Sequence, residues 1–158
     1  MSKPETWREV RAAIRALCEG ESDAIALMAT IACELHRHFD RFDWVGFYRN
    51  IGGEVLKIGP YQGGHGCLTI PFSRGVCGAA ARSRQTVVVP DVDAFPDHIA
   101  CATTTRSEIV LPVFDSAGAL IGVLDIDSDT PDAFDDTDRV ELEAMLDEVF
   151  RRPGAERL

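Results

Sequence analysis

Positive charge and long apolar runs are both scarce in this sequence. Among its 158 residues, 16 are lysine or arginine and 26 are aspartate or glutamate, which gives a net charge of −10 at pH 7. Binding to nucleic acid or to an anionic membrane needs a basic surface, so we expect neither as a partner. No run of 18 apolar residues is present that could span a membrane. The N-terminus lacks the charged and then apolar profile of a signal peptide, which favours a cytoplasmic location.

Length and composition indicate one globular domain over residues 1–158. Hydrophobic residues make up 46% and charged residues 27% of the chain, which are ordinary proportions for a globular protein and exclude a disordered or coiled-coil chain. Apolar residues at helical spacing predict N-terminal helices at about 5–17 and 23–39. A core is expected over about 42–150, followed by a short frayed tail from Arg151.

The core pattern combines short strands, two helices and one long loop. The expected elements are strands at 42–49, 54–61, 67–71, 86–89, 108–114 and 120–126, a helix at 74–82, a loop at 90–106 and a last helix from 135. This order predicts an α+β fold with a central antiparallel sheet and helices packed on one face. The loop would cover a small-molecule pocket on the other face.

The five cysteines are the first residues to consider for chemistry. In the cytosol a disulfide is expected to be transient rather than structural. Cys18 and Cys33 fall on the N-terminal helices, where we expect them to pack as small apolar side chains. Cys67 follows a glycine-rich segment, and Cys101 lies in the long loop. Cys77 lies near the start of a predicted helix, where the helix dipole would favour a thiolate.

The residues alone leave three roles open for Cys67, Cys77 and Cys101. They could be buried packing residues. With His65 and His98, Cys67 and Cys101 could bind a metal, although their spacing matches no common zinc pattern, and we expect no metal. They could also perform thiol redox chemistry, with one nucleophile and one or two resolving partners. The spacing of the cysteines does not decide among these roles.

Three carboxylates favour the redox interpretation. Glu108 begins an apolar strand, and Asp125 and Asp127 flank Ile126 in another. Residues two apart on a strand share a face, so the two aspartates point the same way. Like charges among apolar neighbours are costly unless a cation or a proton lies between them. The alternative is a strand end that runs into solvent.

Two aromatic residues share one face of the first predicted strand. Trp44 and Tyr48 alternate with Gly46 there. They could pack in the core, or they could form the wall of a pocket for a small apolar group. The role of His98 is also open, because this residue could tune the nearby Cys101 thiol or make a hydrogen bond within the loop.

Six motifs in order resemble a known enzyme family. They are DWVGFY at 43–48, GPYQG at 59–63, RGVCG at 74–78, HIAC at 98–101, SEIVLP at 107–112 and GVLDIDS at 122–128. Together they resemble the free methionine-R-sulfoxide reductases, which are small GAF-domain enzymes. The resemblance covers about residues 23 to 148 and includes the three family cysteines.

The resemblance implies the GAF fold and a thiol-dependent reduction of free L-methionine (R)-S-oxide to L-methionine. Cys101 would attack the sulfoxide sulfur and become a sulfenic acid. Cys67 would then form a disulfide with it, with Cys77 as an auxiliary or alternative partner. Thioredoxin, supplied with electrons by NADPH, would reduce the disulfide, so no bound cofactor is implied.

The resemblance also implies a substrate site. Glu108, Asp125 and Asp127 would bind the substrate ammonium and assist proton transfer to the sulfoxide oxygen. Trp44 and Tyr48 would hold the S-methyl group. The competing interpretation is a GAF domain that senses a small molecule without catalysis, although the three acids suit a phosphate ligand poorly. A homodimer through the N-terminal helices is also expected.

This chain departs from the family motifs in two places. His65 and Gly66 stand before Cys67, where the family usually has an aliphatic residue and alanine. Ala102 and Arg106 follow Cys101, where the family usually has aspartate and asparagine. We expect these differences to affect loop closure, the rate or the substrate range.

Overall fold

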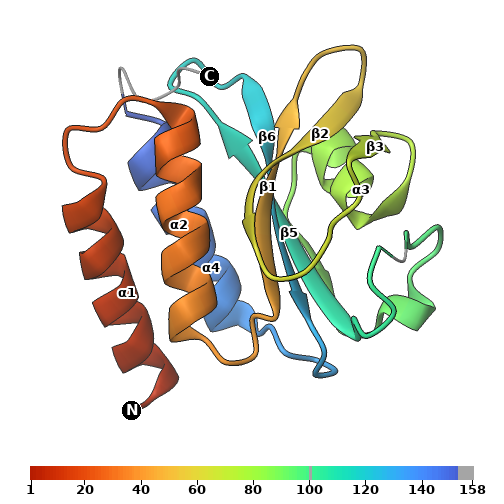
Figure 1. Cartoon of the computed structure of the whole chain (residues 1–158), viewed down its shortest axis with the longest axis horizontal. Coiled ribbons are helices and arrows are strands. Elements are labelled where there is room, and N and C mark those ends of the chain that lie inside the picture. Colours follow the sequence, from red (N-terminus) through yellow and green to blue (C-terminus); the bar gives the residue numbers. More distant parts are fainter. Residues whose placement is uncertain (100, 153–158) are drawn as a thin grey trace.

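The computed structural model of the chain describes residues 1–99 and 101–152. Within these residues, helices cover a six-stranded sheet, and the two N-terminal helices precede its first strand (Figure 1). In chain order the elements are α1 (Lys3–Leu17), α2 (Ala24–His38), β1 (Trp44–Asn50), β2 (Val55–Gln62), β3 (Thr69–Pro71), α3 (Gly75–Ser83), β4 (Val87–Val89), the 3-10 helix η1 (Val92–Ala94), β5 (Ser107–Phe114), β6 (Leu120–Ser128) and α4 (Asp136–Phe150).

Local sequence signals explain where the N-terminal helices begin. In α1, the Ser2 hydroxyl accepts a hydrogen bond from the Glu5 amide, and the Glu5 carboxylate accepts one from the Ser2 amide. In α2, the Asp23 side chain accepts a hydrogen bond from the Ala26 amide. Both helices begin and end within two residues of their predicted first and last residues, because apolar periodicity and capping residues agree there.

The sheet is antiparallel throughout, with the strand order β3-β2-β1-β6-β5-β4. The expected antiparallel sheet is therefore confirmed. The central pairing of β1 with β6 places Trp44 opposite Asp127 and Gly46 opposite Asp125. The pairing of β5 with β6 places Glu108 opposite Asp127. Residues that are far apart in the sequence thus come together on one face of the sheet.

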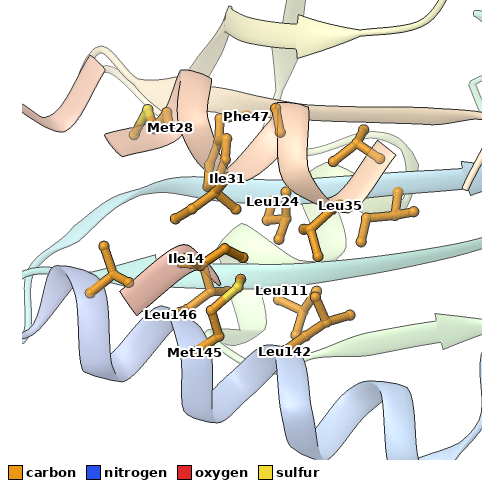
Figure 2. Packing of buried hydrophobic residues seen from close by; sticks show 14 of the residues in the cluster. Ile14, Met28, Ile31, Leu35, Phe47, Leu111, Leu124, Leu142, Met145 and Leu146 are labelled. Carbon is orange, nitrogen blue, oxygen red and sulfur yellow. The ribbon is translucent and has the colours of Figure 1, made fainter. Parts of the chain in front are cut away.

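On the other face, α2 and α4 pack against the sheet and α1 packs against these two helices, and together they form the larger hydrophobic core. Figure 2 shows side chains from these three helices and from the sheet, among them Ile14, Ile31, Leu124 and Leu142. All four are fully or almost fully buried. In the part of the chain that the structure describes, no helix is long and apolar enough to cross a membrane.

Helix α3 differs from the expectation that the helices share one face. It packs on the pocket side, where Val76 and Ala80 join Val110 and Val123 in a second hydrophobic cluster. A Cβ atom at Gly78 would lie 2.6 Å from the carbonyl oxygen of Phe72, so only glycine lets the helix approach the end of β3 this closely.

The structure also bears on the expectations for Cys18, Cys33 and the C-terminal tail. Cys18 is buried as expected, but Cys33 is exposed, because it lies on the solvent side of α2. Arg152 donates hydrogen bonds to the carbonyl oxygens of Cys18 and Glu21, so the chain is still anchored one residue beyond Arg151. The rest of the predicted frayed tail, residues 153–158, lies outside the described residues.

Candidate active site

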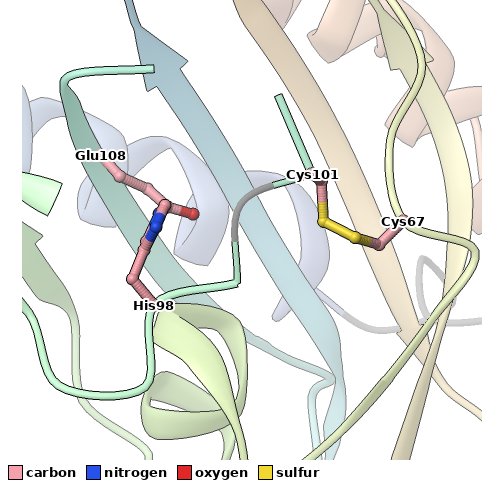
Figure 3. The surroundings of a disulfide bond; sticks show 4 residues. All are labelled: Cys67, His98, Cys101 and Glu108. Atoms are coloured by element: carbon pink, nitrogen blue, oxygen red, sulfur yellow. A yellow bond between two sulfur atoms is a disulfide. The ribbon is translucent and has the colours of Figure 1, made fainter. Parts of the chain in front are cut away.

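Cys67 and Cys101 form a disulfide with a Cα–Cα distance of 5.5 Å (Figure 3). The bond joins the segment between β2 and β3 to the long loop that precedes β5. Of the described cysteines, Cys18, Cys33 and Cys77 are free. The pairing brings together two of the three cysteines that the sequence analysis singled out.

A cavity lies beside this disulfide on the pocket face of the sheet. Seven of the eight site residues named from the sequence line it, and Cys67 is the exception. The lining residues are Trp44, Tyr48, His65, Gly66, Ile70, Gly75, Val76, Cys77, His98, Ile99, Cys101, Ala102, Thr105, Glu108, Asp125 and Asp127. Three of the four departures from the family motifs lie in this lining, and Arg106 is exposed outside it.

Three acidic side chains line one side of the cavity. Glu108 is only 6% exposed and Asp125 only 5%, while Asp127 lies nearer the end of its strand and is partly exposed. Burial, and then repulsion by a neighbouring carboxylate, raises the pKa of each of the three well above its ordinary value. The alternative of a strand end in solvent is therefore wrong for Asp125.

The raised pKa values have two chemical consequences. The cluster holds protons that exposed carboxylates would have released, so it can donate a proton to a bound molecule. It also favours a cation, because a positive charge would relieve the repulsion. Among the described residues, Asp125 Oδ1 is a buried oxygen without a hydrogen-bond partner. Such an atom in a cavity marks a place for a donor from a ligand.

Cys77 lies in the first turn of α3 but has no thiolate character. Its side chain is buried, and burial together with the charges of Asp125, Glu108 and Asp127 raises its pKa well above the ordinary value. The expectation that the helix dipole would favour a thiolate here is wrong. The dipole effect is outweighed because desolvation and three nearby acids all favour the neutral thiol.

Aromatic rings from β1 form another part of the cavity lining. Trp44 and Tyr48 stack with their ring centroids 5.9 Å apart, and Trp44 also stacks on Tyr61 at 5.4 Å. The Trp44 indole Nε1 donates a 2.9 Å hydrogen bond to the carbonyl oxygen of Gly64. A Cβ atom at Gly46 would lie 2.4 Å from the indole ring, so this glycine allows Trp44 to fold over the strand.

The sequence analysis did not single out Tyr61. Its position within the GPYQG motif was the available signal, but its contact with Trp44 depends on the pairing of β1 with β2. Burial raises the pKa of Tyr48, so its phenol stays protonated and available as a hydrogen-bond donor. The core and pocket interpretations of Trp44 and Tyr48 both hold, since the two residues are buried and also line the cavity.

His98 lies on the long loop and reaches the acidic side of the cavity. Its Nε2 is 3.3 Å from Oε1 of Glu108 (Figure 3). Burial lowers the pKa of His98, although Asp93 acts in the opposite direction. The imidazole is therefore largely neutral at pH 7, and its contact with Glu108 is closer to a neutral hydrogen-bonding pair than to a full ion pair.

Known proteins of the GAF-domain family are similar to this chain along almost its entire length. The GAF domain profile matches residues 23–150. The chain is 37% identical to the free methionine-R-sulfoxide reductase of Escherichia coli, over 95% of this chain and 92% of that protein. It is 42% identical to GAF domain-containing protein A of Dictyostelium discoideum, over 92% and 90%. Among solved structures, free methionine-R-sulfoxide reductase from Neisseria meningitidis in complex with its substrate is 42% identical, with a TM-score of 0.88 over 98% of this chain and 93% of that one.

Proposed function

Because this chain belongs to the GAF-domain family and within it to the free methionine-R-sulfoxide reductases, we propose that it reduces free L-methionine (R)-S-oxide to L-methionine. The observation that carries the proposal is the Cys67–Cys101 disulfide beside a cavity that is lined by buried acids and by aromatic rings. This arrangement combines a two-electron thiol couple with groups that suit an amino acid bearing a polar sulfoxide.

Cys101 is the nucleophile in the proposed reaction. Its thiol sulfur attacks the sulfoxide sulfur, the oxygen passes to Cys101, and the products are methionine and a sulfenic acid on the protein. The substrate sulfur is reduced by two electrons and Cys101 is oxidised by two. The Cys67 thiol then displaces water from the sulfenic acid and forms the disulfide.

Cys67 is the better resolving residue of the two candidates. Its sulfur is already bonded to Cys101 in the structure. Cys77 is buried among the acids, and its raised pKa keeps it as a thiol, which is a poor nucleophile. We therefore assign resolution to Cys67 and leave Cys77 as an auxiliary residue of the cavity.

The acids and the aromatic rings orient the substrate. Glu108, Asp125 and Asp127 bind the ammonium group, and a carboxyl among them protonates the sulfoxide oxygen, since oxide is a very poor leaving group. Trp44 and Tyr48 hold the S-methyl group by apolar contact. The first turn of α3 lines the cavity, and among the described residues its N-cap, Arg74, makes no capping hydrogen bond through its side chain, so the amides of this turn suit the substrate carboxylate.

Thioredoxin reduces the Cys67–Cys101 disulfide, with NADPH as the source of electrons and without a bound cofactor in this chain. The reaction takes place in the cytoplasm, where a reducing system of this kind is present. A homodimer through the N-terminal helices stays a prediction, and Leu17 on α1 and Ile25 on α2 are exposed apolar side chains on these helices.

Turnover of the two sulfoxide epimers by the reduced protein tests the proposed function. With dithiothreitol as reductant, the wild type should consume the R epimer of free methionine sulfoxide and leave the S epimer. Cys101→Ser should abolish turnover, whereas the matched variant Cys33→Ser should keep it, because Cys33 is exposed on α2 away from the cavity. Equal turnover by Cys101→Ser would refute the assigned nucleophile, and an inactive wild type would favour the sensor interpretation.

A further inference from the structure

The free thiol in the cavity lies beside two of the buried acids. The Sγ atom of Cys77 and one carboxylate oxygen from each of Glu108 and Asp125 all lie within 4.8 Å of one another. These three residues are at most 6% exposed. The proposed reaction uses Glu108 and Asp125 for the substrate ammonium but leaves the Cys77 thiol without a step of its own.

We propose that Cys77, Glu108 and Asp125 form a binding site for a thiophilic divalent cation, with Zn²⁺ as the natural ligand. Cysteine thiolate and carboxylate are both zinc ligands, and the presence of sulfur disfavours Mg²⁺ and Ca²⁺. Three protein ligands leave one tetrahedral position for water, as in zinc sites that remain open to exchange. On binding, zinc–sulfur and zinc–oxygen bonds form, the S–H bond of Cys77 and the O–H bonds of the protonated carboxyl groups break, and these protons pass to solvent.

The geometry of the three side chains suits one small ion. In a tetrahedral site, zinc bonds of about 2.3 Å to sulfur and 2.0–2.2 Å to oxygen place two ligand atoms roughly 3.4–3.6 Å apart. Ligand atoms that lie within 4.8 Å of one another would therefore move closer by side-chain rotation as the ion binds. Glu108 also has an outer partner, because His98 Nε2 lies 3.3 Å from its Oε1 and would fix the orientation of the carboxylate.

A second observation points independently to a ligand at this place. Asp125 Oδ1 is buried and has no hydrogen-bond partner among the described residues. An unsatisfied buried carboxylate oxygen is costly, and a bound cation would supply the missing interaction. The sequence could not indicate this site, because the three residues lie on α3, β5 and β6 and no zinc spacing pattern connects them.

The cation and the substrate ammonium would use the same carboxylates. Zinc should therefore compete with free methionine sulfoxide and inhibit the enzyme reversibly. The competition rests on the proposed function, whereas the binding of the metal does not. A measurement that reports metal binding directly can consequently separate the two claims.

Cobalt binding to a protein without the disulfide cysteines tests the site. In Cys67→Ser/Cys101→Ser, Cys77 is the remaining free thiol of the cavity, and no turnover consumes the substrate. Titration with Co²⁺, a spectroscopic substitute for Zn²⁺, should produce a thiolate-to-cobalt charge-transfer band, which excess Zn²⁺ should remove. The band should be lost when Cys77→Ser or Asp125→Asn is added, and it should persist when Cys33→Ser is added as the matched control.

The outcomes separate the site from the function. Absence of the band in the double variant, or its persistence after Cys77→Ser, would overturn the metal site. Thermal unfolding of each variant shows that it is folded, and Asp125→Asn provides a second test that leaves the thiol in place. Free methionine (R)-S-oxide should displace the cobalt and reduce the band. A band that the sulfoxide does not reduce would support the metal site and contradict the shared use of the carboxylates.

Discussion

His98 Nε2 lies 3.3 Å from Glu108 Oε1, and this contact links the loop that contains Cys101 to the acidic side of the cavity (Figure 3). The loop is also held at its ends, where the Val92 amide donates a hydrogen bond to the carbonyl oxygen of Arg106. His98 lies between these anchors, three residues before Cys101. It therefore acts as a positioning residue in our account, because it holds the loop over the substrate acids.

Replacement of His98 should weaken substrate binding more than it slows the chemical step. A hydrogen bond between neutral groups contributes about 0.5–1.5 kcal/mol, so His98→Ala should raise KM by roughly 2- to 10-fold. Steady-state kinetics with the R epimer would measure KM and kcat separately, and His98→Asn should restore part of the binding. His36→Ala is the matched control, since His36 lies on α2 on the other side of the sheet. An unchanged KM in His98→Ala would contradict the positioning role.

The buried acids should make the protein less stable as the pH rises. The pKa values of Glu108 and Asp125 are raised in the folded state, so the folded chain keeps protons that the unfolded chain releases above about pH 4. Stability then decreases as the pH rises from that point through the folded-state pKa values. Thermal unfolding of the substrate-free protein between about pH 5 and pH 8 would measure this decrease.

One substitution distinguishes the cavity acids from the rest of the negative charge. Asp125→Asn removes one titrating group, so it should flatten the pH dependence and raise the unfolding temperature at alkaline pH. Asp136→Asn, at an 81% exposed side chain, should leave the pH dependence almost unchanged. If the unfolding temperature depends on pH equally in Asp125→Asn and in the wild type, the raised pKa of Asp125 is contradicted.

Asp138 should be among the most important charged residues for stability. Its side chain is fully buried and accepts hydrogen bonds from Trp7 Nε1 at 2.9 Å and Lys3 Nζ at 3.0 Å, and it pairs with Arg41. Asp138→Ala leaves these donors without their partner and should cost about 3–5 kcal/mol of unfolding free energy. Urea unfolding would measure this loss, and Asp136→Ala, two residues earlier and exposed, should cost much less. A loss below that of Asp136→Ala would contradict the account.

Gly46 should be required for the aromatic wall. A Cβ atom at this position would lie 2.4 Å from the Trp44 ring and 2.6 Å from Cβ of Tyr61, so Gly46→Ala must displace the indole. We expect a loss of about 1–3 kcal/mol in stability and weaker binding of the sulfoxide. Gly64→Ala is the matched control, because a Cβ atom there meets nothing within 4 Å. Binding measured by tryptophan fluorescence should be weakened only in Gly46→Ala.

The sequence alone was sufficient to predict the structural features that depend on local periodicity. The alternation of residues on a strand predicted that Asp125 and Asp127 share a face, and helical spacing with capping residues predicted α1 and α2. It was insufficient where strand register or long-range packing decides. The placement of Glu108 opposite Asp127 depends on how β5 pairs with β6, and no local pattern encodes that register.

Two further failures have the same physical origin. The thiolate expected at Cys77 followed from its position on the helix, but its protonation is set by burial and by acids from β5 and β6. Helix α3 was expected on the same face as the other helices, but its small residues fit the pocket side of the sheet. In both cases the decisive neighbours come from distant parts of the chain.

A single-turnover experiment on the reduced protein tests the central claim most directly. The protein is freed of reductant, mixed with an equal amount of free L-methionine (R)-S-oxide, quenched with an alkylating agent and analysed by peptide mass spectrometry. Our account predicts one methionine formed per protein molecule and a disulfide between the peptides that contain Cys67 and Cys101, with Cys77 alkylated after denaturation. Methionine formation with Cys67 still free, or a disulfide without methionine formation, would contradict it.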